Sequence, residues 1–334
     1  MPFPVLPRGA LYLSLVLLGG ACQSNEPPEM TREQKLGAYL ENALRYYEQR
    51  DYDRALHQVR QGLSVDRRNE RFLLMLGKIH LLRGTKEDLA IAEQVFERHP
   101  EPKDYRVQLG LGEANERLGL LKAESAEAIR SGEAYTEHPD PEERAVELTR
   151  QAREHWERAY QAYEDSLELF RGEVGTVNGL VRVSALLKRE HESIEWSREL
   201  LDVIAESTRL RRLELEDSDI GAGRERDVLD SIRANEEVAI GTHLHVANLY
   251  FRMGLLEEAA DELSRVIEID PERAAAYSQR AQVLFELGRY ALARDSIDRF
   301  LRLSTDRSFD DPDIRRAYEL EARCRAALTD AEGG

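Results

Sequence analysis

The sequence predicts an all-α fold: a solenoid of antiparallel helix pairs, with elongated helices in the middle and a capping helix near the C-terminal end. Three observations support this prediction. Only 21 glycines and 11 prolines occur among 334 residues, and the helix-favouring residues alanine, leucine, glutamate and arginine dominate. A pattern of small residues recurs at an interval of 34 near the C-terminus. Helix-start signals precede several amphipathic stretches.

The first residues differ in composition from the rest of the chain. Arg8 is the only charged residue among the first 25, the segment 10–18 is apolar, and three small residues precede Cys22. This order of a positive charge, a short apolar stretch and a small-residue cleavage site is typical of a secretory signal. The stretch is about half of the ~20 residues that span a bilayer. We therefore predict a signal peptide over 1–21.

The block LLGGAC, which ends at Cys22, resembles a bacterial lipobox. The resemblance implies that Cys22 carries diacylglycerol and contacts the membrane through this lipid, with the polar stretch 22–30 as a flexible tether. Gln23 stands where aspartate often marks inner-membrane retention, which favours an outer-membrane lipoprotein that faces the periplasm. Gly19 departs from the usual leucine, and Gly19 with Ala21 also suits the ordinary signal peptidase. A soluble secreted or periplasmic protein is therefore the alternative.

The repeat is clearest near the C-terminus. Two consecutive units align at an offset of 34 residues, which pairs Gly254 with Gly288 and Ala259 with Ala293. We expect the glycines where a helix ends and the chain turns, and the alanines where two helices cross closely. This order of residues resembles the tetratricopeptide repeat (TPR), and the resemblance implies C-terminal repeats over 223–310.

Related units precede this region. The segment 36–69 fits the same pattern, and Thr31 with Gln34 predicts a capping box at the start of its first helix. In the middle of the chain, Asp140 and Pro141 mark the start of one long helix, whose apolar residues recur at intervals of three and four. The middle helices are therefore longer than those of the repeat family.

These patterns divide the chain after the tether into four parts. N-terminal and middle TPR-like repeats are expected over 31–206, a polar joint over 207–222, the C-terminal repeats over 223–310 and a capping helix over 311–329. A polar end helix is expected because the last repeat of a solenoid has no neighbour to cover it. Cys324, the only other cysteine, is predicted to be a small residue of this helix.

No arrangement of residues indicates catalysis or a metal site. His191 and Glu195 make only half of a zinc-protease helix motif. His243 and His245 are two residues apart and point away from each other on a helix, and the segment that begins at Asp217 lacks the closing acid of a calcium loop. The net charge of −17 argues against nucleic acid, because binding phosphates needs a basic face. We expect no enzymatic activity, no cofactor and no metal.

The TPR resemblance implies a concave groove lined by the first helix of each unit. The groove positions most suited to partner binding are Asn248, Phe251, Arg252, Gln282 and Phe285 in the C-terminal units and Tyr47 and Lys78 in the N-terminal ones. Phe251 and Phe285 recur at the same position of adjacent units, so we expect both rings to anchor apolar side chains of a protein or peptide ligand. The alternative is that the rings, and the leucines at 40, 44 and 74, pack beneath neighbouring helices.

The resemblance implies a lipid-anchored TPR scaffold or adaptor that mediates protein–protein interactions in the bacterial cell envelope. The alternative function is an accessory subunit of a polysaccharide or cell-wall synthesis system, with a carbohydrate-facing cleft between the long middle helices. Trp156, Tyr160 and Tyr163 are the residues that favour this alternative.

Overall fold

The computed structural model describes residues 30–216 and 220–333, and within them the chain forms thirteen α-helices and no strand. The predicted all-α fold is confirmed. The helices are α1 (Arg32–Glu48), α2 (Tyr52–Val65), α3 (Glu70–Arg83), α4 (Lys86–Glu97), α5 (Tyr105–Arg130), α6 (Pro141–Leu169), α7 (Val174–Leu186), α8 (Glu190–Leu215), α9 (Ala222–Arg252), α10 (Leu256–Ile269), α11 (Ala274–Glu286), α12 (Tyr290–Leu303) and α13 (Pro312–Gly333).

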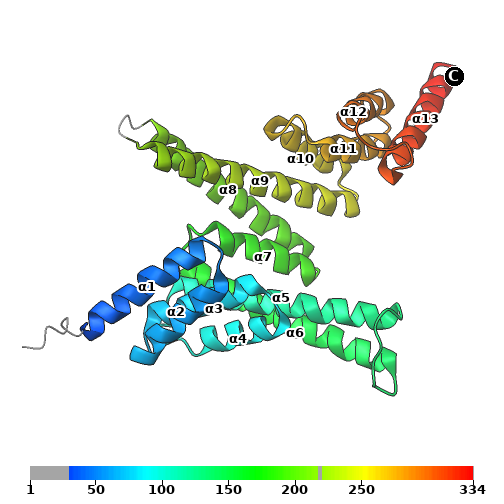
Figure 1. The fold of residues 1–334 in the computed structure, drawn as a ribbon. Coiled ribbons are helices and arrows are strands. Elements are labelled where there is room, and N and C mark those ends of the chain that lie inside the picture. The colour runs from blue at the N-terminus through cyan, green and yellow to red at the C-terminus, as the bar shows by residue number, and fades with distance from the viewer. Residues whose placement is uncertain (1–29, 217–219, 334) are drawn as a thin grey trace, which may run out of the picture.

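Each helix packs mainly on the helices before and after it in the chain, so the molecule is a row of helix pairs (Figure 1). First helices of successive pairs also touch, because α3 contacts α5 and α5 contacts α7. The buried apolar residues accordingly form separate clusters along the row, with the largest in the C-terminal helices α9 to α13 and another within α1 to α3. This arrangement is that of a helical solenoid.

Two hairpins of long helices interrupt the regular repeat. Helices α5 and α6 have 26 and 29 residues, and α8 and α9 have 26 and 31. In Figure 1 both hairpins extend beyond the shorter helices. Asp140 caps α6 as predicted, since its side chain accepts hydrogen bonds from the backbone N–H groups of Glu142 and Glu143 at 3.0 and 3.1 Å. The polar segment 207–222 belongs to α8 as far as Leu215, and α9 begins at its last residue.

The turns after the first helices share one geometry. Gly254 and Gly288 lie in the left-handed region, with φ of 76° and 73°, and the next residue donates its N–H to a carbonyl five positions earlier. This is the C-terminal motif that favours glycine. Arg50 and Lys188 hold the same position in two other turns, with φ of 59° and 60°. The glycine turns are confirmed, and two further turns form without glycine.

Small residues allow close packing where the repeat pattern predicted it. Ala259 and Ala293 are both fully buried. In the middle of the chain, the ring of Tyr163 on α6 lies between Gly112 on α5 and Gly179 on α7. A Cβ atom added at either glycine would lie 2.6 Å or less from an atom of the ring. The aromatic side chain of one helix therefore fills the space between two neighbouring helices.

The two ends of the array also follow the sequence analysis. Thr31 and Gln34 form the capping box of α1, with N–H···O distances of 3.2 and 2.8 Å. At the other end α13 packs on α12 and α11, and Cys324 is buried in this contact. Burial raises the pKa of its thiol. Cys324 is thus a small core residue, as expected.

In the described part of the chain, no helix is both long enough and apolar enough to cross a bilayer. The predicted signal peptide, Cys22 and all of the tether except Met30 lie outside the described residues, as do positions 217–219 of the segment that resembles a calcium loop.

Candidate functional site

A small hollow opens between α9 and α11 on the surface formed by the first helices of the C-terminal units. It has a volume of ≈ 210 Å³ and is lined by Ala247, Asn248, Phe251, Leu263, Gln279, Gln282 and Val283. Ala247, Leu263 and Val283 are buried and form an apolar floor. Phe251 is partly buried and forms a wall. The hollow can therefore receive an apolar side chain.

The polar groups of this hollow are all uncharged. Asn248, Gln279 and Gln282 each bear a carboxamide, and none of the lining residues carries a charge. Asn248 precedes Phe251 by three residues on α9, and Gln279 precedes Gln282 by three on α11, so each pair lies on one helix face. A carboxamide donates and accepts hydrogen bonds. The rim therefore matches the N–H and C=O groups of a peptide backbone.

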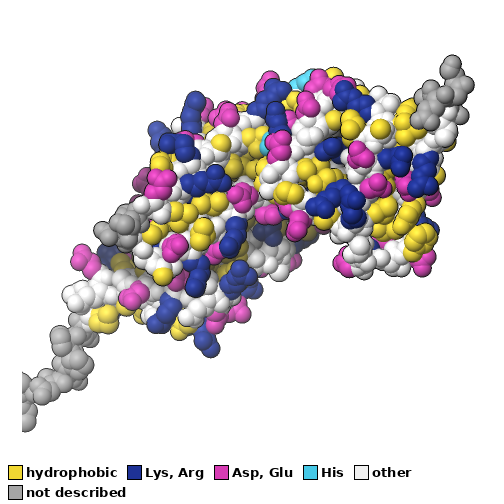
Figure 2. Space-filling model, turned by 90° about the horizontal axis from the view of Figure 1, so that it is seen from above, with side chains coloured by type: hydrophobic (Ala, Val, Ile, Leu, Met, Phe, Trp, Pro, Cys, Tyr) yellow, Lys and Arg dark blue, Asp and Glu magenta, His cyan; other side chains and the backbone are white. Residues whose placement is uncertain are grey.

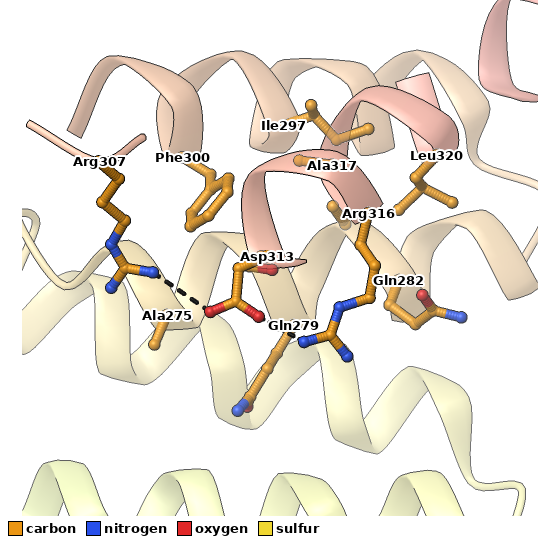
Figure 3. A pocket seen from close by; sticks show the side chains of 12 residues that line it. Ala275, Gln279, Gln282, Ile297, Phe300, Arg307, Asp313, Arg316, Ala317 and Leu320 are labelled. Atoms are coloured by element: carbon orange, nitrogen blue, oxygen red, sulfur yellow. Dashed lines mark hydrogen bonds and ion pairs between the residues drawn. The ribbon is translucent and has the colours of Figure 1, made fainter. Parts of the chain in front are cut away.

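A second hollow of ≈ 330 Å³ lies beside the first, between α11, α12 and α13 (Figure 3). Gln279 and Gln282 line both hollows. On the side of α13, Asp313 forms ion pairs with Arg307 at 3.2 Å and with Arg316 at 2.5 Å, drawn as dashed lines in Figure 3. The capping helix thus adds a charged wall next to the uncharged hollow.

Phe285 is in a different environment from Phe251. Its ring packs against that of Tyr290, with centroids 5.3 Å apart, and the guanidinium carbon of Arg323 lies 4.2 Å from the ring centroid. Arg323 belongs to α13, so the capping helix covers one face of this ring. Phe285 lines neither hollow. Phe251 is therefore the ring of the pair that remains open to a partner.

Arg252 points toward α8. Its guanidinium forms an ion pair with Glu190 at 2.9 Å, so this side chain is held next to the preceding unit. Arg252 lines neither of the two C-terminal hollows. The structure thus places Asn248, Phe251 and Gln282 together and separates Arg252 and Phe285 from them.

A larger groove of ≈ 680 Å³ lies at the N-terminal end of the array. We call it the N-terminal groove; its lining residues are Leu40, Leu44, Tyr47, Glu70, Arg71, Leu74, Met75, Lys78, His99, Asp104 and Arg106. The predicted residues Tyr47 and Lys78 meet here, on α1 and α3. Burial, followed by the proximity of Tyr52 and Glu113, raises the pKa of Tyr47, so its hydroxyl is neutral and can donate a hydrogen bond.

A network of charged side chains joins helices in the middle of the array; its central carboxylate, Glu116, is buried, whereas the side chain of Arg182 is 45% exposed. Arg182 on α7 forms a forked ion pair with Glu116 on α5, at 2.6 and 2.7 Å, and Tyr163 donates its hydroxyl to the same carboxylate at 2.7 Å. Burial alone would lower the pKa of Arg182, but Glu116 raises it. Glu113 lies one turn before Glu116, and burial raises its pKa. These contacts join three helices, α5, α6 and α7, which belong to two successive units of the array.

Two family models match parts of the chain. Residues 40–88 match a model described as tetratricopeptide repeat, and residues 247–288 match a model described as TPR repeat. The chain contains TPR repeats. The match over 247–288 includes all lining residues of the hollow next to Phe251, and the match over 40–88 includes most of those of the N-terminal groove.

Solved structures agree with this fold. The nuclear import adaptor Nro1 of S. pombe is similar with a TM-score of 0.51 and 11% sequence identity, over 88% of this chain and 99% of that one. A thermophilic TPR protein of Thermus thermophilus is 16% identical, with a TM-score of 0.41, over 75% of this chain and 99% of that one. No curated protein sequence matches the chain. At 11% identity the likeness to Nro1 shows the fold alone and nothing about ligands.

The aromatic residues that favoured a carbohydrate-facing cleft do not form one in this TPR array. Tyr163 is fully buried between two glycines and hydrogen-bonds Glu116, so it has no free face for a sugar. Trp156 is partly buried in the same cluster. The guanidinium carbon of Arg189 lies 4.9 Å from the ring centroid of Tyr160. Tyr163 therefore cannot face a ligand, and Trp156 and Tyr160 are only partly exposed beside it.

His243 and His245 on α9 contact side chains of two different helices. His243 lies 2.6 Å from Glu262 on α10, whereas His245 lies 2.9 Å from Ser193 on α8. Their side chains therefore point apart, as their spacing predicted. Among the described residues, no group of three or more histidine, cysteine, aspartate or glutamate side chains is placed to hold a metal ion.

Gln279 is a lining residue that the sequence analysis missed. It lies three residues before Gln282 on α11 and contacts both C-terminal hollows. The signal was available, since a residue one turn before a groove position shares its helix face.

Proposed function

We propose that this protein is a lipid-anchored TPR scaffold of the bacterial envelope that binds segments of other proteins on the surface formed by its first helices. TPR repeats generally mediate protein–protein interactions, and TPR proteins are typically non-enzymatic scaffolds. The observation that carries the proposal is the hollow beside Phe251, with its apolar floor and its rim of three carboxamides.

The hollow suits an uncharged peptide segment with one bulky apolar side chain. That side chain would insert between Phe251 and the buried floor, and Asn248, Gln279 and Gln282 would bind the neighbouring backbone groups. Aromatic residues at the wall of a desolvated pocket often contribute about 2 kcal/mol or more of binding free energy. An internal segment fits better than a chain end, because no cation lines the hollow to bind a terminal carboxylate.

Anchoring at Cys22 would hold the array close to the membrane. The tether 22–30 could span at most about 30 Å when fully extended. The support is the order of charge, apolar stretch, small residues and cysteine in the sequence. An outer-membrane protein that faces the periplasm is the localisation we propose.

Phe251→Ala tests binding, and Phe285→Ala is its matched control at the equivalent position of the next unit. A photo-crosslinking amino acid at position 282 would identify partners in cells by mass spectrometry. We expect Phe251→Ala to remove the crosslinked partners while circular dichroism stays unchanged, and Phe285→Ala to retain them. Loss of stability with full crosslinking in Phe251→Ala would show that this ring only supports the core.

Palmitate labelling tests the anchor separately. We expect wild-type protein to incorporate labelled palmitate and Cys22→Ser to accumulate as an unprocessed precursor. A mature, unlabelled wild-type protein would instead indicate cleavage by the ordinary signal peptidase and a soluble product.

A further inference from the structure

We propose that the N-terminal groove is a second binding site, specific for a partner helix that carries leucine-type side chains next to a carboxylate. This inference rests on the proposed function in assuming that the TPR surface binds protein segments, but it concerns different residues and a different ligand chemistry. The partner would be acidic and amphipathic, whereas the hollow beside Phe251 suits an uncharged segment.

The first argument is an apolar stripe without a covering helix. Leu40, Leu44 and Tyr47 follow one another at intervals of four and three, so they lie on one face of α1, opposite Leu74 on α3. Leu44 is 44% exposed, although it lies between apolar neighbours. The volume of ≈ 680 Å³ is within the range of ligand pockets. The apolar stripe of α1, with Leu74 opposite it on α3, matches the apolar face of a third helix.

The second argument is the local charge. Positive and negative side chains are interspersed over the face in Figure 2, and about half of the arginines of the described residues form an ion pair with a carboxylate. In the groove, Arg106 is held by Asp104 with N···O distances of 2.9 and 3.1 Å. No carboxylate of the described residues forms an ion pair with Arg71 or Lys78, so the groove holds two cationic side chains besides the paired Arg106.

Lys78 is placed to receive the carboxylate of a partner. It is partly buried and follows Leu74 by one turn of α3, so its ammonium group lies at the side of the apolar stripe. Glu113 is near enough to influence both Tyr47 and Lys78. Burial raises the pKa of Glu113 more than the charge of Lys78 lowers it, and no hydrogen bond joins Glu113 to Lys78. An incoming carboxylate could therefore form a charge-assisted hydrogen bond with Lys78. The lining of the groove carries three basic side chains, Arg71, Lys78 and Arg106, against two acidic ones, a slight positive excess in a chain of net charge −17.

Two chemically distinct sites would make the protein a bivalent adaptor. The matched segment 247–288 contains the hollow beside Phe251, and the segment 40–88 contains most of the lining of the N-terminal groove. Two segments of one partner would bind with higher apparent affinity than either alone, provided that the linker between them spans the array. Alternatively, each site would recruit a different protein to the same anchor.

Direct binding of designed peptides to the purified full chain tests this inference. The probes are two fluorescein-labelled, alanine-based helical peptides with leucines at i, i+4 and i+7; one carries glutamates beside this stripe and the other carries lysines. We expect the glutamate peptide to bind more tightly, measured by fluorescence anisotropy, and to lose affinity as salt concentration rises. Lys78→Glu should weaken its binding roughly tenfold and strengthen that of the lysine peptide.

Three controls make the result decisive. Lys86→Glu changes the net charge equally but alters α4, outside the groove, and should have no effect. Lys78→Gln tests the loss of the charge without a new repulsion, and circular dichroism checks the fold of each variant. Phe251→Ala should leave peptide binding unchanged, so failure of the proposed function at the C-terminal hollow would be seen separately. Equal binding of both peptides, an equal effect of Lys78→Glu and Lys86→Glu, or no binding at millimolar concentration would overturn the inference.

Discussion

Replacing Gly179 by alanine should destabilise the middle of the array. The added Cβ would lie 2.4 Å from Cζ of Tyr163. The ring cannot move away, because Gly112 borders it on another helix, where an added Cβ would also be only 2.6 Å from the ring. Its hydroxyl is held by Glu116 at 2.7 Å. Relief of the clash therefore requires α5, α6 or α7 to shift.

The expected change in the free energy of unfolding combines two destabilising effects with one stabilising effect. Overpacking of a core costs about 1–3 kcal/mol, and alanine gains about 1 kcal/mol over glycine in a helix. If the shift also breaks the bond from Tyr163 to Glu116, a hydrogen bond to a charged group worth about 1.5–3 kcal/mol is lost. We expect the free energy of unfolding to fall by about 2 kcal/mol.

Gly241→Ala is the matched control. Gly241 lies inside α9, is exposed, and has no atom within 4 Å of an added Cβ. This substitution should therefore raise the free energy of unfolding by up to about 1 kcal/mol. The two changes are chemically identical and should have opposite signs.

Tryptophan fluorescence in urea measures the effect where it occurs. The chain has two tryptophans, and both Trp156 and Trp196 pack against the cluster that contains Tyr163. A local probe is needed because repeat arrays can unfold in parts. An unfolding midpoint of Gly179→Ala equal to or above that of wild type would refute the rigid placement of this ring.

Three further predictions concern stability. Lys188→Gly should raise the free energy of unfolding by roughly 0.5–1 kcal/mol in urea melts, because Lys188 has a φ of 60° in a turn that favours glycine. Ala259→Leu and Ala293→Leu should each lower it by about 1–3 kcal/mol, since both alanines are fully buried; an unchanged midpoint would contradict the packing. Burial, followed by the charges of Arg158 and Lys122, lowers the pKa of His155 from 6.5 to about 4. The unfolded chain then binds a proton at higher pH than the folded one, so this contribution to stability is lost as the pH falls from about 6.5 to about 4. His155→Gln should reduce the dependence of the unfolding free energy on pH between about 6.5 and about 4, measured in urea melts at several pH values.

The regular repeats could be predicted because each position of the pattern has a local cause. Gly254 and Gly288 supply the left-handed turn, and Ala259 and Ala293 supply the close crossing. The start of α6 was equally visible, because an N-cap aspartate before proline acts within a few residues.

The α8–α9 hairpin was harder to predict. Its distal half is polar enough to suggest a joint, yet it is helical on both sides of 217–219. In the first turns of α9, Val228 and Ile232 are buried at a spacing of four. Two buried apolar residues are enough to hold this part of α9 in place, because α8 and α9 pack along each other. Tertiary packing of a sparse apolar stripe therefore outweighs the polar composition of the segment.

The sequence predicted the candidate site correctly only for residues whose surroundings are formed by the repeats themselves. Asn248, Phe251 and Gln282 meet as expected. Phe285 has the same position in the repeat as Phe251 but not the same surroundings, because Arg323 on α13 covers its ring. This contact comes from a helix outside the repeats, and the repeat pattern contains no information about it.

The difference between the two rings follows from how a solenoid ends. The last unit has no successor, so α13 takes the place of the next helix and covers apolar surface that would otherwise meet water. The same helix then occupies the position from which a ligand would reach Phe285. Equivalent positions in a repeat are thus equally suited to binding only when both have a repeat on each side. In this chain, helices α7 and α8 precede the unit that contains Phe251, and α11 and α12 follow it. We therefore expect a partner to occupy the hollow beside Phe251 rather than the hollow beside α13.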